Sequence, residues 1–556
     1  MHEGLRNLGD EYREAWLRRS PTTALMLGDH RYDDQMEDLS REAEDDAIAE
    51  LRSFADRAEA IDPADLSLQE RLSREVLIFE ARTGAAVTET RQAELEANPA
   101  MSLHVLLPTA AAQFPIIEPE HAEALVVKCE KLGRAIEQWA VRLQEGVAND
   151  RTPPALMAEK VVHQLDEYLA SPLESDPLAT GVRAPAAFDE ATEEAWRGRL
   201  RERVGSHVRP GFAELRRVLA EEVLPVARPD HEVGIQWIEG GEEAYRAAIL
   251  NNTSVDMTAE EIHQIGLDTI ASIEDEYRLL GSEVFGSRDL QTIYSKLNED
   301  PNLRYETADE VVAASEEAFA KAKAAIGGWF GRLPKADCLV STVTQGPEAF
   351  YFPPAEDGSR PGIFFMNVAE PSSWTRYALE ATVFHEGIPG HHLQLAIAQE
   401  LEDIPEFRKH TSVTAYAEGW GLYTERLSDE MGLYSGPLQR MGMLSADSLR
   451  ASRLVVDTGM HALGWSRQQA IDYMTANVPA SGVSLTNEVD RYIGLPGQAL
   501  AYMIGRREIM RIRSKAKAAL GGSFDIKSFH DTILGSGALP LPVLAHLVDE
   551  WVAGRA

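Results

Sequence analysis

The sequence predicts a mainly α-helical protein that contains one small β-sheet. Through most of the 556 residues, apolar side chains recur at intervals of three and four with charged residues between them, which is the pattern of amphipathic helices. Residues 337–368 differ, because two β-prone runs there flank a turn-rich stretch. We therefore expect an N-terminal helical lobe at 1–225 and a second lobe at 226–556 that carries the sheet.

Helices are expected in both lobes. In the first lobe the spacing of three and four covers Leu39–Arg91, Ala122–Ala148 and Phe188–Leu224. In the second lobe the same pattern, bounded by Gly, Pro and Ser, predicts helices at Ser373–Glu386, Thr414–Met431, Gln439–Gly459, Ser466–Asn477, Gly497–Leu520 and Pro542–Val552.

The sheet is predicted at Asp337–Val343 and Gly362–Val368, about 337–368 in all. The run GIFFMNV combines aromatic and β-branched residues and is bounded by prolines, and Pro353–Pro361 is rich in turn residues. If GIFFMNV is an edge strand, it can pair with an extended peptide through main-chain hydrogen bonds. An ordinary buried strand is the other interpretation of the same residues.

Charge and cysteine content exclude several classes of protein. Acidic residues number 90 and basic residues 54, and the net charge of −36 opposes binding to nucleic acid or to an anionic membrane. No apolar run approaches the roughly 20 residues of a membrane span, and the N-terminal residues show no apolar leader. Two cysteines, Cys129 and Cys338, cannot build a disulfide framework. We expect a cytoplasmic protein that has no nucleic-acid or membrane partner.

The residues most suited to metal binding and hydrolysis are concentrated in ALEATVFHEGIPGHHLQ, residues 378–394. This run places His385, Glu386, His391 and His392 within eight positions. A zinc hydrolase needs neutral imidazoles as ligands and an adjacent carboxylate that takes a proton from water. The common form of such a motif, HExxH, places its two histidines four residues apart on one helix. Here the second histidine follows after six residues, so the common geometry does not apply.

A continuous helix would keep these histidines apart. His385 and His391 would lie about 9 Å apart along the axis and about 120° out of phase. Pro389 cannot donate to the carbonyl of His385, and Gly387 and Gly390 loosen the backbone on either side. We therefore predict that the helix is interrupted between the two histidines, so that both reach one ion.

The identity of the second ligand stays open at this point. Zinc peptidases of the dipeptidyl-peptidase III kind carry one extra residue in the same place, and there the second ligand commonly follows glycine. By that similarity His391, which follows Gly390, is favoured, with His392 as the alternative. In a purely structural interpretation, the histidines would only bond backbone carbonyls.

A third ligand is expected from the segment Thr411–Tyr434. Its run Glu418–Gly421 resembles the glutamate-bearing run that supplies the third ligand in zinc aminopeptidases related to thermolysin. Glu418 and Glu425 are seven residues apart and share one helical face. Gly419 and Gly421 each cost about 1 kcal/mol in a helix, which a close approach to the His-bearing helix would explain. Glu425 is expected to support a ligand rather than bind the ion.

The sequence resembles the bacterial domain-of-unknown-function family 885. The family's mark, His-Glu-x-x-Pro-Gly-His-His-x-Gln, is here HEGIPGHHLQ (385–394), and GDHRYDD (28–34), EGWGLYTERL (418–427) and RYIGLPGQALAYMIGR (491–506) fit as well. The resemblance implies a gluzincin-like metallopeptidase. It also implies a fold similar to the zinc oligopeptidases, with two helical lobes around a deep channel and a small sheet beside the metal site.

The implied function is zinc-dependent hydrolysis of peptide or small amide substrates. Zn²⁺ would be held by His385, His391 and Glu418, and Glu386 would act as the general base.

In the helical oligopeptidases a downstream tyrosine, often with a histidine, contacts the reacting group. Tyr502 is the favoured counterpart, Tyr492 is its alternative, and His461 is the expected substrate contact. Two rival functions remain: a non-catalytic helical peptide-binding protein, and a metal hydrolase of a non-peptide amide or ester.

Overall fold

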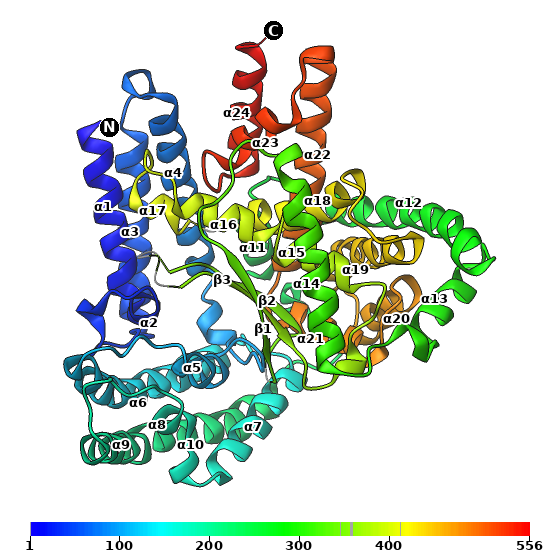
Figure 1. The fold of residues 1–556 in the computed structure, drawn as a ribbon. Coiled ribbons are helices and arrows are strands. Elements are labelled where there is room, and N and C mark those ends of the chain that lie inside the picture. Colours follow the sequence, from blue (N-terminus) through cyan, green and yellow to red (C-terminus); the bar gives the residue numbers. More distant parts are fainter. Residues whose placement is uncertain (1, 345, 356–357, 359, 412, 556) are drawn as a thin grey trace.

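Helices make up most of the fold, as the sequence predicts (Figure 1). The computed structural model describes residues 2–344, 346–355, 358, 360–411 and 413–555. Up to residue 225 its α-helices are α1 (Glu3–Arg19), α2 (Pro21–Met26), α3 (Arg41–Glu59), α4 (Leu68–Glu89), α5 (Leu103–Ala111), α6 (Pro119–Ala148), α7 (Ala155–Ala170), α8 (Pro177–Thr180), α9 (Glu190–Arg203) and α10 (Arg209–Val218).

The remainder of the chain supplies the helices that surround the candidate site. Those predicted after residue 373 are found, most with ends shifted by a few residues. The helices are α11 (Gly241–Thr253), α12 (Ala259–Phe285), α13 (Leu290–Glu299), α14 (Ala308–Ala325), α15 (Leu379–Glu386), α16 (His391–Gln399), α17 (Glu406–Lys409), α18 (Thr414–Glu430), α19 (Pro437–Ala462), α20 (Arg467–Asn477), α21 (Gly482–Gly494), α22 (Ala501–Leu520), α23 (Ile526–Leu534) and α24 (Leu541–Ala553).

A three-stranded sheet lies at the centre of Figure 1. Its strands β1 (Cys338–Val343), β2 (Ala349–Phe352) and β3 (Gly362–Asn367) are arranged in the order β1-β3-β2, with β3 parallel to β1 and antiparallel to β2. The two predicted strands are confirmed, whereas β2 was not predicted. Part of the predicted turn Pro353–Pro361, residues 356–357 and 359, lies outside the described residues.

Of the two interpretations of GIFFMNV, the structure supports the ordinary buried strand and not the edge strand. This run is β3, which is hydrogen-bonded on both sides, so its backbone has no free edge for a peptide. Phe364 and Met366 are fully buried because they face the core on one side of the sheet. The edges of the sheet are β1 and β2.

The described residues form more than one hydrophobic core. One core lies within residues 25–224. The largest core, however, combines residues of α1, α3 and α4 with residues from 235 to 551. The first helices therefore pack with the second lobe, and Figure 1 shows them beside α16 and α17, while α5–α10 form a separate layer below.

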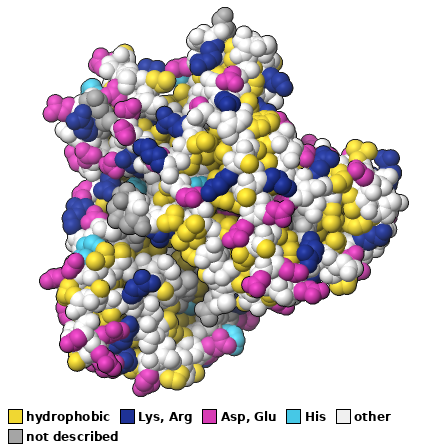
Figure 2. All heavy atoms as spheres, in the orientation of Figure 1, with side chains coloured by type: hydrophobic (Ala, Val, Ile, Leu, Met, Phe, Trp, Pro, Cys, Tyr) yellow, Lys and Arg dark blue, Asp and Glu magenta, His cyan; other side chains and the backbone are white. Residues whose placement is uncertain are grey.

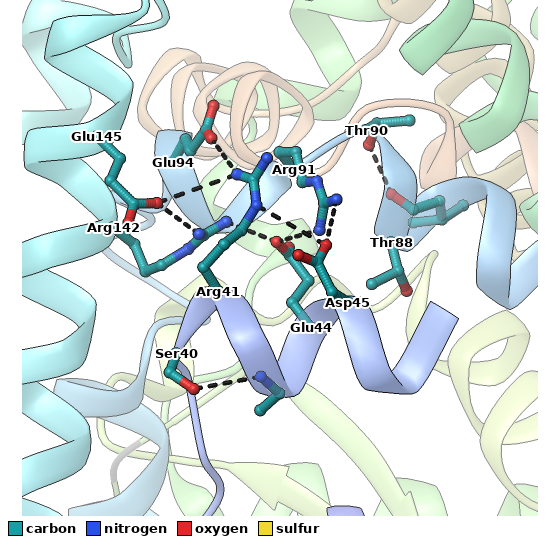
Figure 3. A network of polar contacts seen from close by, with 12 residues as sticks. Ser40, Arg41, Glu44, Asp45, Thr88, Thr90, Arg91, Glu94, Arg142 and Glu145 are labelled. Atoms are coloured by element: carbon teal, nitrogen blue, oxygen red, sulfur yellow. Dashed lines mark hydrogen bonds and ion pairs between the residues drawn. The ribbon is translucent and has the colours of Figure 1, made fainter. Parts of the chain in front are cut away.

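Ion pairs attach α6 to α3, and α3 to the turn after α4 (Figure 3). Arg142, which is 1% exposed, lies 2.6 Å from Glu44 and 2.5 Å from Glu145. Arg41 lies 2.8 Å from the buried Glu94. Because each buried charge has an opposite partner, its desolvation is compensated and the layer of α5–α10 is held against the first helices.

Between this layer and the sheet lies a cavity of about 1580 Å³. It is lined by residues of α3, α5 and α6 and by Phe350, Phe352 and Phe365 of the sheet. On the face drawn in Figure 2, acidic and basic side chains are dispersed among one another rather than gathered in one patch. Within the described residues, none of the helices has the length and apolar character required to cross a membrane.

Candidate metal centre

The His-bearing helix is interrupted between its two histidines, as the sequence predicts. Helix α15 ends at Glu386 and α16 begins at His391, and the peptide bond between Ile388 and Pro389 is cis. The indole nitrogen of Trp420 donates to the Pro389 carbonyl over 3.0 Å, so α18 holds the bend in place. A side chain at Gly390 would not fit, because its Cβ would lie 1.9 Å from the His385 carbonyl oxygen.

This bend brings the side chains of His385, His391 and Glu418 together. The Nε2 atom of His385 lies 3.5 Å from Oε2 of Glu418, and the Nε2 atom of His391 lies 3.4 Å from the same oxygen. One donor atom of each residue lies within 4.8 Å of the other two. All three side chains are buried or partly buried.

The three residues fit a zinc ion. Tetrahedral ligands that lie about 2.0–2.1 Å from zinc are separated from one another by about 3.3 Å. The separations of 3.4 and 3.5 Å from Glu418 to the two imidazoles are close to this value. Two imidazoles and one carboxylate are also a typical donor set of catalytic zinc sites, which leave a fourth position free.

Glu425 orients His385 from behind. Its Oε1 atom lies 2.8 Å from Nδ1 of His385, and both side chains are buried. A carboxylate on the second nitrogen is the usual support of a metal-binding histidine. Against the effect of burial, Glu418 and Glu425 raise the pKa of His385 to about 9. Also against burial, the two imidazoles hold the pKa of Glu418 well below its usual value.

His392 bonds a tyrosine of the sheet and not the group formed by His385, His391 and Glu418. Its Nδ1 atom lies 2.8 Å from the hydroxyl oxygen of Tyr351, a residue of β2, and burial lowers its pKa to about 4. Gly362 of β3 leaves room for this contact, since a Cβ there would lie 2.4 Å from the Tyr351 oxygen. Of the two candidate ligands, the structure therefore places His391 beside Glu418.

Close packing of α18 against α15 depends on Gly421. A Cβ at this position would lie 2.7 Å from Cε1 and 2.8 Å from Nε2 of His385. The predicted close approach to the His-bearing helix thus occurs at Gly421. Gly419 instead faces α22, where its Cβ would lie 2.5 Å from Gly505.

Replacing Gly421 with Ala should lower zinc affinity about 10- to 100-fold, because the added methyl group displaces the His385 imidazole. It should also cost about 1–3 kcal/mol of stability through overpacking. Competition titration with a zinc chelator measures the first effect and chemical denaturation the second. Gly482→Ala is the matched control, since a Cβ there meets no atom within 4 Å. Equal zinc affinity in both variants would contradict the geometry.

Glu386 and Tyr502 both lie near His385. Glu386 directly follows His385 and is partly exposed. The ring of Tyr502, on α22, lies 6.4 Å from the His385 ring, with the two planes 19° apart. Burial and the charge of Glu418 raise the pKa of Tyr502, so that its hydroxyl stays protonated and can donate a hydrogen bond at neutral pH.

The structure does not bring His461 to this group. His461 is 1% exposed; its Nδ1 accepts from the backbone N–H of Ile235 over 3.1 Å, and its Nε2 lies 3.0 Å from the Tyr492 carbonyl oxygen. Burial lowers its pKa to about 4. With both nitrogens bound to backbone groups, His461 has no atom left for a substrate, and its role is structural.

A second cluster of possible metal ligands consists of His30, Asp33 and His121. Here Nδ1 of His30 already bonds the Asp33 carboxylate over 2.7 Å, and the two imidazoles are stacked at 3.6 Å. His121 accepts long hydrogen bonds from two backbone N–H groups at the start of α6. One nitrogen of each ring is therefore in use, and no carboxylate stands in the position that Glu386 has beside His385.

Two sets of neighbouring residues were not predicted. Tyr351, which holds His392, lies on the unpredicted strand β2. Arg450 and Arg453 lie over the ring of Tyr502. The two arginines are three residues apart on a predicted helix, so the sequence alone could have indicated that they share one face.

Comparisons with known proteins identify the family. The family described as bacterial protein of unknown function (DUF885) matches residues 21–548. A "putative lipoprotein" from Colwellia psychrerythraea is similar over 99% of both chains, with a TM-score of 0.93 and 25% identity. A "putative lipoprotein of unknown function" from Shewanella oneidensis matches 98% of this chain and 99% of its own, with a TM-score of 0.74 and 18% identity. No curated protein matches. The protein belongs to the DUF885 family.

Proposed function

We propose that this protein is a zinc-dependent hydrolase of peptide bonds that acts on short peptides, and that its site is of the gluzincin kind. The observation that carries the proposal is the convergence of His385, His391 and Glu418, with Glu386 directly after the first histidine. Metal ligands alone would also suit a structural zinc site. A partly exposed carboxylate beside the ligands favours a hydrolytic one.

Each residue near the proposed zinc site would have a separate role in hydrolysis. A zinc ion, when bound, supplies Lewis acidity that activates water and polarises a carbonyl group. Glu386 would accept the proton of the attacking water and pass it to the leaving amine. Tyr502 would donate a hydrogen bond to the oxygen on which negative charge develops. Glu425 would keep the imidazole of His385 in its orientation.

Metal dependence of peptide hydrolysis tests the proposal. The chelator-treated protein should not cleave a library of short peptides, and activity should return with about one equivalent of zinc. Zinc binding without any hydrolysis would contradict the proposal and favour a non-catalytic peptide-binding protein. Cleavage of esters or non-peptide amides alone would instead favour the wider class of metal hydrolases.

Replacing Tyr502 with Phe should lower kcat about 10²- to 10³-fold, because one donor to the developing oxyanion is lost. Zinc content should stay unchanged, since the hydroxyl is not a ligand. Steady-state kinetics with metal analysis measure both quantities. Tyr473→Phe on α20, outside the site, is the control and should keep the wild-type kcat. An unchanged kcat in Tyr502→Phe would remove this residue from the mechanism.

The cytoplasmic location expected from the sequence stays a prediction. Cys129 and Cys338 are both free and buried, which agrees with a reducing compartment. The two similar structures are of proteins described as lipoproteins, and that description belongs to those proteins. Fractionation of the native host's cells tests the location directly.

A further inference from the structure

We propose that three arginines beside Tyr502 bind a carboxylate of the substrate, and that the preferred substrates are short peptides with a free C-terminal carboxylate. The inference rests on the proposed hydrolase function and names its substrate class. The arginines are Arg450 and Arg453 on α19 and Arg491 on α21.

These arginines are close to the candidate metal centre. The guanidinium carbon of Arg453 lies 4.5 Å from the centre of the Tyr502 ring, and that of Arg450 lies 5.8 Å from it. The same ring lies 6.4 Å from the ring of His385. Arg491 also acts on the Tyr502 hydroxyl electrostatically, where its charge opposes the rise in pKa.

Each guanidinium has a buried nitrogen that has no hydrogen-bond partner among the described residues. The atoms are Nε of Arg450, Nη1 of Arg453 and Nη2 of Arg491. Arg453 as a whole is 5% exposed. A buried and charged donor that is left unpaired is costly, so a ligand that accepts these hydrogen bonds would be bound favourably.

The positive charge of the group is only partly balanced. Glu488 accepts hydrogen bonds from Arg453 over 2.7 and 3.2 Å and lies 3.6 Å from Arg491. Despite its burial, these two arginines lower the pKa of Glu488 to about 2. Arg450 has its carboxylate neighbour, Glu425, at 4.0 Å, and that carboxylate is already bound to the metal centre's histidine. Among the described residues, Glu488 is therefore the carboxylate that pairs with Arg453 and Arg491, and Glu348 acts on Arg450 only electrostatically.

A carboxylate is the kind of group that would bind to the unbalanced positive charge of these arginines. The planar fork of a guanidinium matches the two oxygens of a carboxylate. An extended chain advances about 3.3–3.6 Å per residue, so a carboxylate at the arginines would lie about one to three residues from a peptide bond at the zinc ligands. The C-terminal carboxylate of a peptide lies at this distance from one of the last peptide bonds of the chain.

The test compares peptides of one sequence that end in a free carboxylate or in an amide. For the zinc-loaded wild type, kcat/KM should be at least about tenfold higher for the free acid. In Arg450→Gln and Arg491→Gln this ratio should fall towards one. Arg511→Gln, an exposed arginine that pairs with Glu508, is the matched control and should keep the wild-type ratio.

A binding measurement separates this inference from the proposed function. Calorimetry on zinc-loaded Glu386→Gln, which leaves the peptides intact, should show tighter binding of the free acid by a similar factor. Hydrolysis and binding that do not distinguish acid from amide would overturn the carboxylate site and leave the hydrolase standing. If the free acid binds more tightly but the wild type hydrolyses neither peptide, the carboxylate site stands and the hydrolase function is contradicted. If the protein neither binds nor hydrolyses the peptides, both the carboxylate site and the proposed hydrolase function are contradicted.

Discussion

Replacing Glu386 with Gln should lower kcat/KM for peptide hydrolysis about 10²- to 10⁴-fold while zinc remains bound. A carboxamide has nearly the same shape as a carboxylate but cannot accept the proton of the attacking water. The predicted loss corresponds to about 3–5 kcal/mol of transition-state stabilisation. Zinc content should not change, because the proposed ligand atoms belong to His385, His391 and Glu418.

Two measurements on the same preparation check this result: peptide kinetics and metal analysis. Glu406→Gln is the matched control, since this carboxylate on α17 is 53% exposed and pairs with Lys409 on the same helix. It should behave as the wild type. Retained hydrolysis in Glu386→Gln would show that another group is the base, whereas loss of zinc together with activity would leave the role of Glu386 as base unsupported.

Removing the His391 side chain should reduce zinc affinity by more than about 100-fold, which exceeds the effect expected from changing a supporting residue. Replacement by Ala leaves only His385 and Glu418, and two donors do not make a stable zinc site. Peptide hydrolysis should disappear with the metal. Adding excess zinc should restore little activity.

The adjacent histidine is the natural control for this experiment. His392→Ala should keep zinc and activity, because that side chain bonds Tyr351 and does not reach Glu418. Its cost should be about 1 kcal/mol of stability, since the tyrosine hydroxyl loses its partner. Loss of zinc in His392→Ala with retention in His391→Ala would reverse the assignment of the ligand.

Local patterns in the sequence predict most of this fold. The predicted helix Thr414–Met431 differs from α18 by one residue at its end, because its amphipathic pattern is uninterrupted. GIFFMNV was recognised as a strand from its β-branched and aromatic residues. Its neighbour β2 has four residues and is followed by two prolines, so its signal was too short to recognise. Which strand occupies the centre of the sheet is decided by long-range pairing, so the sequence alone leaves the edge and the buried interpretations of GIFFMNV open.

The candidate site was predictable where its chemistry is local. Pro389 and its flanking glycines predicted the interruption between α15 and α16, because proline cannot donate to the helix. The choice between His391 and His392 depends on Tyr351, which is about forty residues away. His461 was misassigned because its two backbone partners lie in distant segments that no local pattern can indicate.

The central claim is that His385, His391 and Glu418 bind one zinc ion. Anomalous diffraction from crystals of the zinc-loaded protein, recorded on both sides of the zinc absorption edge, tests it most directly. We expect a peak about 2.0–2.2 Å from the Nε2 atoms of both histidines and from a Glu418 oxygen. A peak only at His30 and His121, or no peak at all, would contradict it.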